Sequence, residues 1–123
     1  MYAGLAFEHF VHDHAHIVSE KAGYKDQIKH IGSYWQRPTK RKTGVQIDVL
    51  IECHGNTTLV CECKWSGKKT GLSAVNQLRK QLKAYPNKNQ HTLIPVLLSA
   101  GGVAQAVKKE KDIVVITIDD FIR

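Results

Sequence analysis

Two apolar runs separated by a turn signal constrain the fold of this chain more than any other feature. Residues 45–51 read Val-Gln-Ile-Asp-Val-Leu-Ile, and residues 59–65 read Leu-Val-Cys-Glu-Cys-Lys-Trp. Gly55 and Asn56 lie between the runs, and both residue types are typical of turns. Runs of this length and composition, joined by a turn, predict two antiparallel strands.

The alternation of side chains along the second run separates its charged residues from its cysteines. Glu62 and Lys64 share one face of the predicted strand. Cys61, Cys63 and Trp65 share the other face, where we expect them to be mostly buried, with the thiols reduced.

Asp48 interrupts the first apolar run, and the turn decides which face of the sheet it occupies. A simple two-residue turn at Gly55 and Asn56 would put Asp48 on the face opposite Glu62. A three-residue loop or a bulge would put Asp48 directly across from Glu62, with Cβ atoms about 4.5–5.5 Å apart. Two carboxylates that close repel each other unless a cation lies between them, so a metal site here requires a non-simple turn.

Such a site would suit Mg²⁺ (or Mn²⁺), a cation that prefers oxygen ligands and keeps several waters. Asp48 and Glu62 would supply carboxylates, and the backbone carbonyl of Cys63 is a candidate third ligand. A bound cation would polarise a phosphoryl oxygen and acidify a water, while Lys64 would orient that water or stabilise negative charge. The alternative is a surface salt bridge between Lys64 and either carboxylate, but a charge within an apolar run favours a site.

Zinc is a weaker alternative at two places. The three cysteines could join His54, although tetrahedral sites usually draw ligands from loops such as Cys-x-x-Cys. His12 and His16 have the i, i+4 spacing that can bind zinc on a helix, but no third ligand is evident.

The remaining pattern predicts helices and strands packed in layers around a mixed sheet, an α/β or α+β fold. A helical apolar stripe covers residues 4–21, and a second helix covers residues 72–85. Extended segments are expected within residues 25–35, 92–99 and 113–118, and Pro95 implies that its strand begins late or lies at an edge. A short helix ending near Lys109 and a last helical turn over residues 119–123 complete the prediction.

The 123 residues suit one domain covering residues 1–123. No apolar run is long enough to span a bilayer, and the start of the chain lacks a signal pattern, so we expect a cytoplasmic protein without a membrane partner. The net charge of +7 favours a polyanionic partner, although solubility alone or a membrane surface would also account for it. Residues that could contact phosphates are Trp35, Arg37, Lys40, Arg41, Lys42, Lys68 and Lys69.

Residues 46–50 and 61–65 together resemble the PD-(D/E)XK nuclease superfamily, which has a restriction-endonuclease-like fold. Ile47 stands where the family pattern has proline. The resemblance implies an αβββαβ core with a C-terminal αβ, and a metal-dependent nuclease that cleaves DNA. It also implies metal-binding Glu8 in the first helix, and catalytic Gln77 or Gln81 in the helix after Glu-x-Lys.

The chain is most similar to nuclease-like domains at the C-terminus of bacterial and archaeal AAA-type ATPases. The shared features are the opening at residues 4–8, His14, the Gln-Ile-Asp strand and residues 98–101. No P-loop occurs in the sequence, so the resemblance implies an excised domain or a stand-alone relative, with an ATPase domain as a candidate partner in cis or in trans. A homodimer is also compatible.

Three functions compete at this point. The first is a Mg²⁺-dependent deoxyribonuclease with Asp48, Glu62, Lys64, Gln77 and Gln81 as catalytic residues. The second is a catalytically silent nucleic-acid-binding domain of the same fold, and the third is a protein-interaction domain of a larger ATPase.

Overall fold

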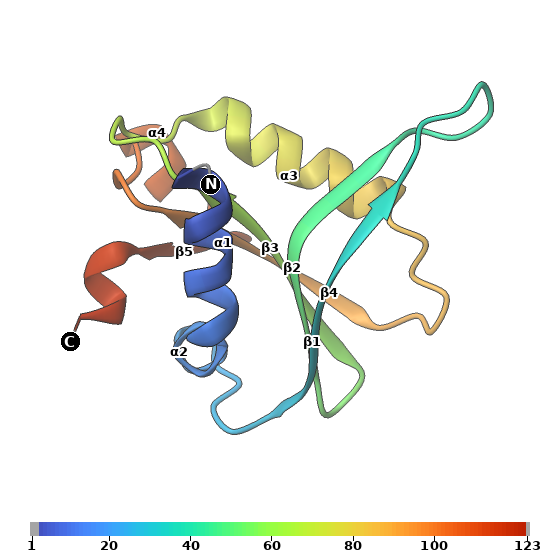
Figure 1. Cartoon of the computed structure of the whole chain (residues 1–123), viewed down its shortest axis with the longest axis horizontal. Coiled ribbons are helices and arrows are strands. Elements are labelled where there is room, and N and C mark those ends of the chain that lie inside the picture. The colour runs from blue at the N-terminus through green and yellow to red at the C-terminus, as the bar shows by residue number, and fades with distance from the viewer. Residues whose placement is uncertain (1–2, 123) are drawn as a thin grey trace.

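Five strands form one mixed sheet, and helices cover both of its faces (Figure 1). The computed structural model describes residues 3–122. The elements in chain order are α1 (Ala3–Asp13), α2 (Ala15–Lys21), β1 (Ile28–Gln36), β2 (Val45–Cys53), β3 (Thr57–Lys64), α3 (Leu72–Ala84), β4 (Thr92–Ser99), α4 (Gln105–Lys108), β5 (Val114–Thr117) and a 3₁₀ helix, η1 (Ile118–Phe121). The strands follow one another across the sheet in the order β1-β2-β3-β4-β5, antiparallel from β1 to β3 and parallel from β3 to β5. The predicted α/β class and order of elements are confirmed.

The loop between β2 and β3 has three residues, as the metal-site interpretation required. Cys53 pairs with Thr57, which leaves His54, Gly55 and Asn56 as the loop. Gly55 and Asn56 have φ angles of 81° and 55°, a left-handed conformation that Gly and Asn adopt most readily.

The core has two layers, one on each face of the sheet. On one face, α1 and α2 pack against a cluster that includes Val11, Val18, Ile51 and Leu98. On the other face, α3 and α4 cover a second cluster around Leu78 and Leu97. No helix within residues 3–122 has the length and apolarity needed to cross a bilayer.

The single helix predicted over residues 4–21 is wrong in one respect, because the chain breaks at His14 into α1 and α2. The His14 ring donates from Nδ1 to the Phe10 carbonyl oxygen (2.8 Å) and stacks on the Phe10 ring, with centroids 4.2 Å apart. The apolar stripe nevertheless continues across the break, since Val11, Ala15 and Val18 are all buried.

Two predictions about strand ends have different outcomes. β4 does not begin late: it pairs with β3 from Thr92 onward, but β5 joins it only at Val96, so Pro95 lies where one edge of β4 has no partner. The prediction that Trp65 is mostly buried is wrong, because its side chain is 52% exposed. β3 ends at Lys64, so Trp65 follows the strand into a loop and loses the cover that the sheet gives Cys61.

Candidate metal-binding site

The site lies where β2 leaves β3. The β2–β3 ladder runs from Cys53 and Thr57 to Val49 and Cys61 and stops there, although β3 continues to Lys64. Beyond this point β2 stays paired with β1, and Figure 1 shows these two strands diverging together from the rest of the sheet. The result is a fork whose two sides are β2 and the end of β3.

β2 contains a bulge at this fork. Along the β1–β2 ladder, Gly32 pairs with Leu50 and Tyr34 pairs with Ile47, so β1 advances two residues while β2 advances three. One residue of β2 therefore has no counterpart on β1. A bulge of this kind changes the direction of a side chain and bends the strand, and bulges are frequent next to active sites.

The two core clusters identify Asp48 as the inserted residue. Ile47 and Leu50 belong to the cluster under α3, whereas Val49 and Ile51 belong to the cluster under α1. Without Asp48, these residues would alternate regularly between the faces. Asp48 is thus freed from the alternation and borders cavities on both sides of the sheet.

A hydrogen bond across the fork fixes the position of Asp48. The backbone N–H of Cys63 donates to Asp48 Oδ2 at 2.9 Å. In a strand, the N–H and C=O of one residue point to the same side, and the next residue points to the other side. Because the Lys64 carbonyl accepts from the Ala100 N–H on the β4 side, the Cys63 carbonyl points toward β2, beside the Asp48 carboxylate.

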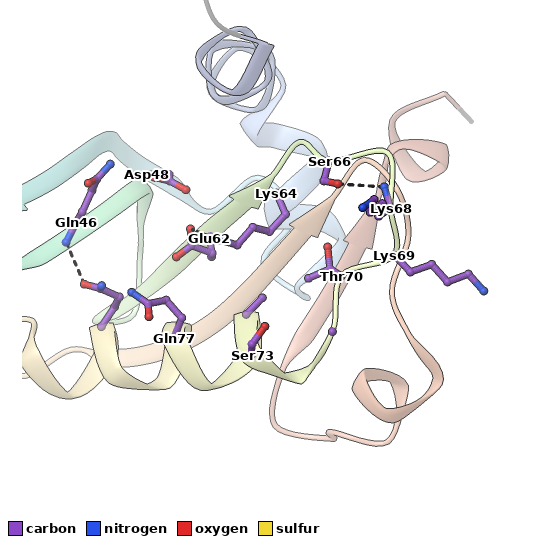
Figure 2. Close-up of a pocket in the computed structure, with 13 residues that line it drawn as sticks. Gln46, Asp48, Glu62, Lys64, Ser66, Lys68, Lys69, Thr70, Ser73 and Gln77 are labelled. Carbon is purple, nitrogen blue, oxygen red and sulfur yellow. Dashed lines mark hydrogen bonds and ion pairs between the residues drawn. The ribbon is translucent and has the colours of Figure 1, made fainter.

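Glu62 and Lys64 share the face covered by α3, as predicted. Lys64 Nζ lies 3.8 Å from Glu62 Oε1, and only 13% of the Glu62 side chain is exposed (Figure 2). Burial above all, and then the charge of Asp48 and a hydrogen bond with it, raise the pKa of Glu62 to about 8, although the charge of Lys64 lowers it. The fold therefore buries the carboxyl group of Glu62 beside the carboxylate of Asp48, which opposes the ionisation of Glu62.

A cavity of about 610 Å³ opens in front of these groups, between the fork and α3. Gln77 and Gln81 line it from α3. Lys68 and Lys69 line it from the loop after β3 (Figure 2). Gln81 Oε1 accepts a hydrogen bond from the Gln46 backbone N–H (3.0 Å), which ties α3 to β2 across the open fork. The structure thus gives Gln81 a positioning contact that the sequence did not predict.

The loop over residues 66–71 is held against β4 by close backbone packing. A Cβ atom on Gly101 would lie 2.4 Å from the Lys68 carbonyl oxygen and 2.5 Å from that of Ser66, so only glycine fits there. Thr70 Oγ1 donates to Ser99 Oγ (2.7 Å), which in turn donates to the Gly102 carbonyl oxygen. The sequence step at residues 98–101 therefore positions the loop that carries Lys68 and Lys69.

Polar side chains of Ser66, Thr70 and Ser73 also line the cavity, and the sequence analysis did not single them out. Serine and threonine are common in loops and at helix starts, so their residue types gave no signal. Only the packing of the loop onto β4 brings them to the cavity.

The structure brings one of the other predicted site residues close to the fork and keeps the basic loop away from it. Glu8 approaches Asp48 from α1, on the opposite face of the sheet from Glu62, and burial and the Asp48 charge raise the pKa of Glu8. The basic loop, which carries Arg37, Lys40, Arg41 and Lys42, lies at the free end of the β1–β2 arm (Figure 1), and none of its side chains lines the cavity at the fork.

The donor atoms at the fork suit a small divalent cation. Within residues 3–122 the side chains of His, Cys, Asp and Glu form no group of three or more that could hold one ion, so we take Glu8 no further than a prediction as a ligand. Asp48, Glu62 and the Cys63 carbonyl remain, and they are all oxygen donors. Mg²⁺ usually takes one or two protein carboxylates and keeps several waters, so these residues fit it.

Two solved structures share this fold. The crystal structure of a repair endonuclease from Pyrococcus abyssi matches with a TM-score of 0.59 and 13% sequence identity, over 89% of this chain and 44% of that chain. The structure of a protein of unknown function, AF1548, matches with a TM-score of 0.61 and 16% identity, over 87% of this chain and 58% of that one. This chain thus has a nuclease-like fold and spans about half the length of the two structures.

A family model matches part of the sequence. The model of a family described as archaea bacterial proteins of unknown function, DUF234, matches residues 1–77, which include α1, the bulge, Glu62 and Lys64. No curated protein matches the chain.

Proposed function

The chain belongs to the DUF234 family, and we propose that it is a metal-dependent nuclease domain of the PD-(D/E)XK type that hydrolyses DNA phosphodiester bonds. The observation that carries this proposal is the convergence of Asp48, Glu62 and Lys64 at the fork. The nuclease-like fold and the description of one structural neighbour as a repair endonuclease support it.

A purely structural role explains this cluster poorly. Glu62 is mostly buried beside Asp48, and this burial and the Asp48 charge oppose its ionisation and raise its pKa. Buried like charges are costly unless a counter-charge lies between them, and Lys64, at 3.8 Å and 38% exposed, offsets only part of this cost. A divalent cation held by the two carboxylates and the Cys63 carbonyl would remove it.

The residues at the fork then have separate roles. When bound, Mg²⁺ (or Mn²⁺) would supply Lewis acidity toward a phosphoryl oxygen and lower the pKa of a coordinated water. The Cys63 N–H holds the Asp48 carboxylate in place, and this carboxylate would be one ligand of the ion. Lys64 stabilises the negative charge that develops on the phosphate or on the attacking water, and Lys68 and Lys69 attract the DNA backbone into the cavity.

Two amides and one carboxylate complete the proposed site. Gln77 lines the same cavity as Glu62, and Gln81 holds β2 in place through Gln46. Glu8 approaches from α1 and stays a prediction as a metal ligand. An ATPase domain as partner and a homodimer likewise stay predictions.

Cleavage of plasmid and of labelled oligonucleotide, with Mg²⁺ or Mn²⁺ and with EDTA, tests the proposal. Asp48→Ala should abolish turnover and weaken Mg²⁺ binding in a calorimetric titration, because it removes a ligand. Lys64→Ala should lower the rate at least about 100-fold with Mg²⁺ binding nearly intact, because it removes charge stabilisation only. Lys109→Ala, an exposed lysine outside the cavity, is the matched control and should leave the rate unchanged.

The outcomes separate the competing functions. Full activity of Lys64→Ala, with contaminating nuclease excluded, would rule out the proposed role of the amine. Salt-sensitive DNA binding without cleavage would identify a silent binding domain. If the protein neither binds nor cleaves DNA, a protein-interaction domain is the function that remains.

A further inference from the structure

A second hollow adjoins the fork on the opposite face of the sheet. It has a volume of about 490 Å³ and shares Gln46 and Asp48 with the cavity described above. The bulge explains why Asp48 borders both hollows: at a bulge, the side chains no longer alternate regularly between the two faces of the sheet. The two hollows therefore meet at the proposed metal-binding carboxylate.

The walls of this second hollow differ from those of the first. One face of α1 forms one wall with Leu5, Glu8, His9 and His12, which follow the i, i+3, i+4, i+7 spacing of a helix face. Trp35 of β1 also lines this hollow. The first cavity has lysines and no aromatic ring in its lining, whereas this hollow has no lysine and adds the rings of Tyr34 and Trp35 to the carboxylates of Glu8 and Asp48.

Trp35 is exposed to an extent that packing does not explain. Trp35 is 66% exposed, and Leu5, which lines the same hollow, is 43% exposed. An isolated exposed apolar residue is ordinary, but here two of them border a hollow that leads to the proposed site. A tryptophan offers a large, flat and rigid surface for contact.

The position of Trp35 matches the size of a nucleotide. Trp35 pairs with Gln46, two positions before Asp48 on β2. A strand rises about 3.3 Å per residue, so the backbone positions of Trp35 and Asp48 lie roughly 7 Å apart along the strand direction. One nucleotide could therefore place its phosphate at the fork and its base against the indole ring.

From these observations we propose that Trp35 is a stacking platform for an unpaired base next to the scissile phosphate, and that the substrate is single-stranded DNA. This inference rests on the proposed nuclease function. In a duplex the faces of each base are covered by its neighbours, so an aromatic ring at this place can contact a base only where the strand is unpaired. Stacking combined with a basic surface is the usual way in which proteins bind single strands without sequence preference, and the net charge of +7 suits it.

Fluorescence provides a direct test, since the chain has two tryptophans. In Trp65→Phe the only remaining indole is Trp35, and its emission should be quenched by a short oligonucleotide of mixed sequence but not by a blunt duplex of that sequence. EDTA is present throughout, so that the metal required for the proposed hydrolysis is withheld. Absence of quenching by the single strand, or equal quenching by the duplex, would overturn the inference.

Binding measured by anisotropy of the same labelled oligonucleotide gives a second readout. Trp35→Ala should raise the Kd for the single strand about 5- to 150-fold, the range expected for loss of one stacked base. Trp35→Phe should restore most of the affinity, because a ring remains. Trp65→Ala is the matched control: Trp65 is also exposed (52%) but lines neither hollow, so its Kd should stay near that of the wild type.

Equal losses in Trp35→Ala and Trp65→Ala, or no loss in either, would refute the role of Trp35. The cleavage assay with Mg²⁺ keeps this result apart from the proposed function. If Trp35 stacks on bases but no DNA is cleaved, the proposed hydrolysis is refuted and the role of Trp35 stands. If duplex DNA is cleaved and Trp35→Ala does not affect the cleavage, the hydrolysis stands and the role of Trp35 is refuted.

Discussion

Replacing Glu62 by Gln removes a carboxyl group that folding places beside Asp48. The pKa of Glu62 is raised from its ordinary 4.5 to about 8, mainly by burial and then by the Asp48 charge and hydrogen bond. Between these two pH values the folded state retains a proton that the unfolded chain has released. The stability of the metal-free protein should therefore fall as the pH rises from about 4.5 to about 8 and stay level above it.

The size of this effect follows from the same pKa. One pH unit of displacement corresponds to about 1.4 kcal/mol, so the upper limit above pH 8 is about 5 kcal/mol. The Glu62 side chain keeps some contact with solvent (13% exposed), and Glu62→Gln also gives up the partly exposed contact with Lys64, worth up to about 1 kcal/mol. We expect Glu62→Gln to be more stable than the wild type by about 2–3 kcal/mol at alkaline pH and little changed near pH 4.5.

Urea denaturation in EDTA across this pH range measures the difference. The matched control is Glu20→Gln, since Glu20 also pairs with a lysine (Lys25, 3.9 Å) but is 54% exposed. The stability of the Glu20→Gln protein should differ from that of the wild type by less than about 0.5 kcal/mol. Added Mg²⁺ should stabilise the wild type at alkaline pH and have little effect on Glu62→Gln. If the stability of the wild type rose with pH, or if Glu62→Gln followed the same pH dependence, the reasoning about the carboxylate pair would be wrong.

Other substitutions test the packing around the site. Gly101→Ala should destabilise the protein by more than about 2 kcal/mol in urea denaturation, because its Cβ would collide with two carbonyl oxygens, whereas Gly67→Ala in the same region meets nothing within 4 Å and should be nearly neutral. Gln81→Ala should cost about 0.5–1.5 kcal/mol by losing its bond to β2, and Gln77→Ala, which has no such bond, should cost less by the same measurement. Burial raises the pKa of the Cys61 thiol, so iodoacetamide should label it in urea and not in the native protein at neutral pH; native labelling at the denatured rate would contradict its burial.

Local rules of strand geometry were sufficient to predict part of the site from sequence. The shared face of Glu62 and Lys64 follows from the two-residue period of a strand, which does not depend on what packs against it. The requirement for an odd loop or a bulge follows from the same logic, because one of the two is needed to bring Asp48 to the side of Glu62. The apolar runs and the helical apolar stripes predicted the mixed sheet and its helices, because these patterns also depend only on the local geometry of each element.

The tertiary structure decided what depends on contacts between distant segments. The bulge at Asp48 is defined only by pairing with β1, which the sequence of β2 does not encode locally. The approach of Glu8, the bond from Gln46 to Gln81 and the exposure of Trp65 likewise depend on which element covers which part of the sheet. Sequence period fixes the direction of a side chain relative to its own backbone, whereas the meeting of side chains from separate elements depends on how those elements pack.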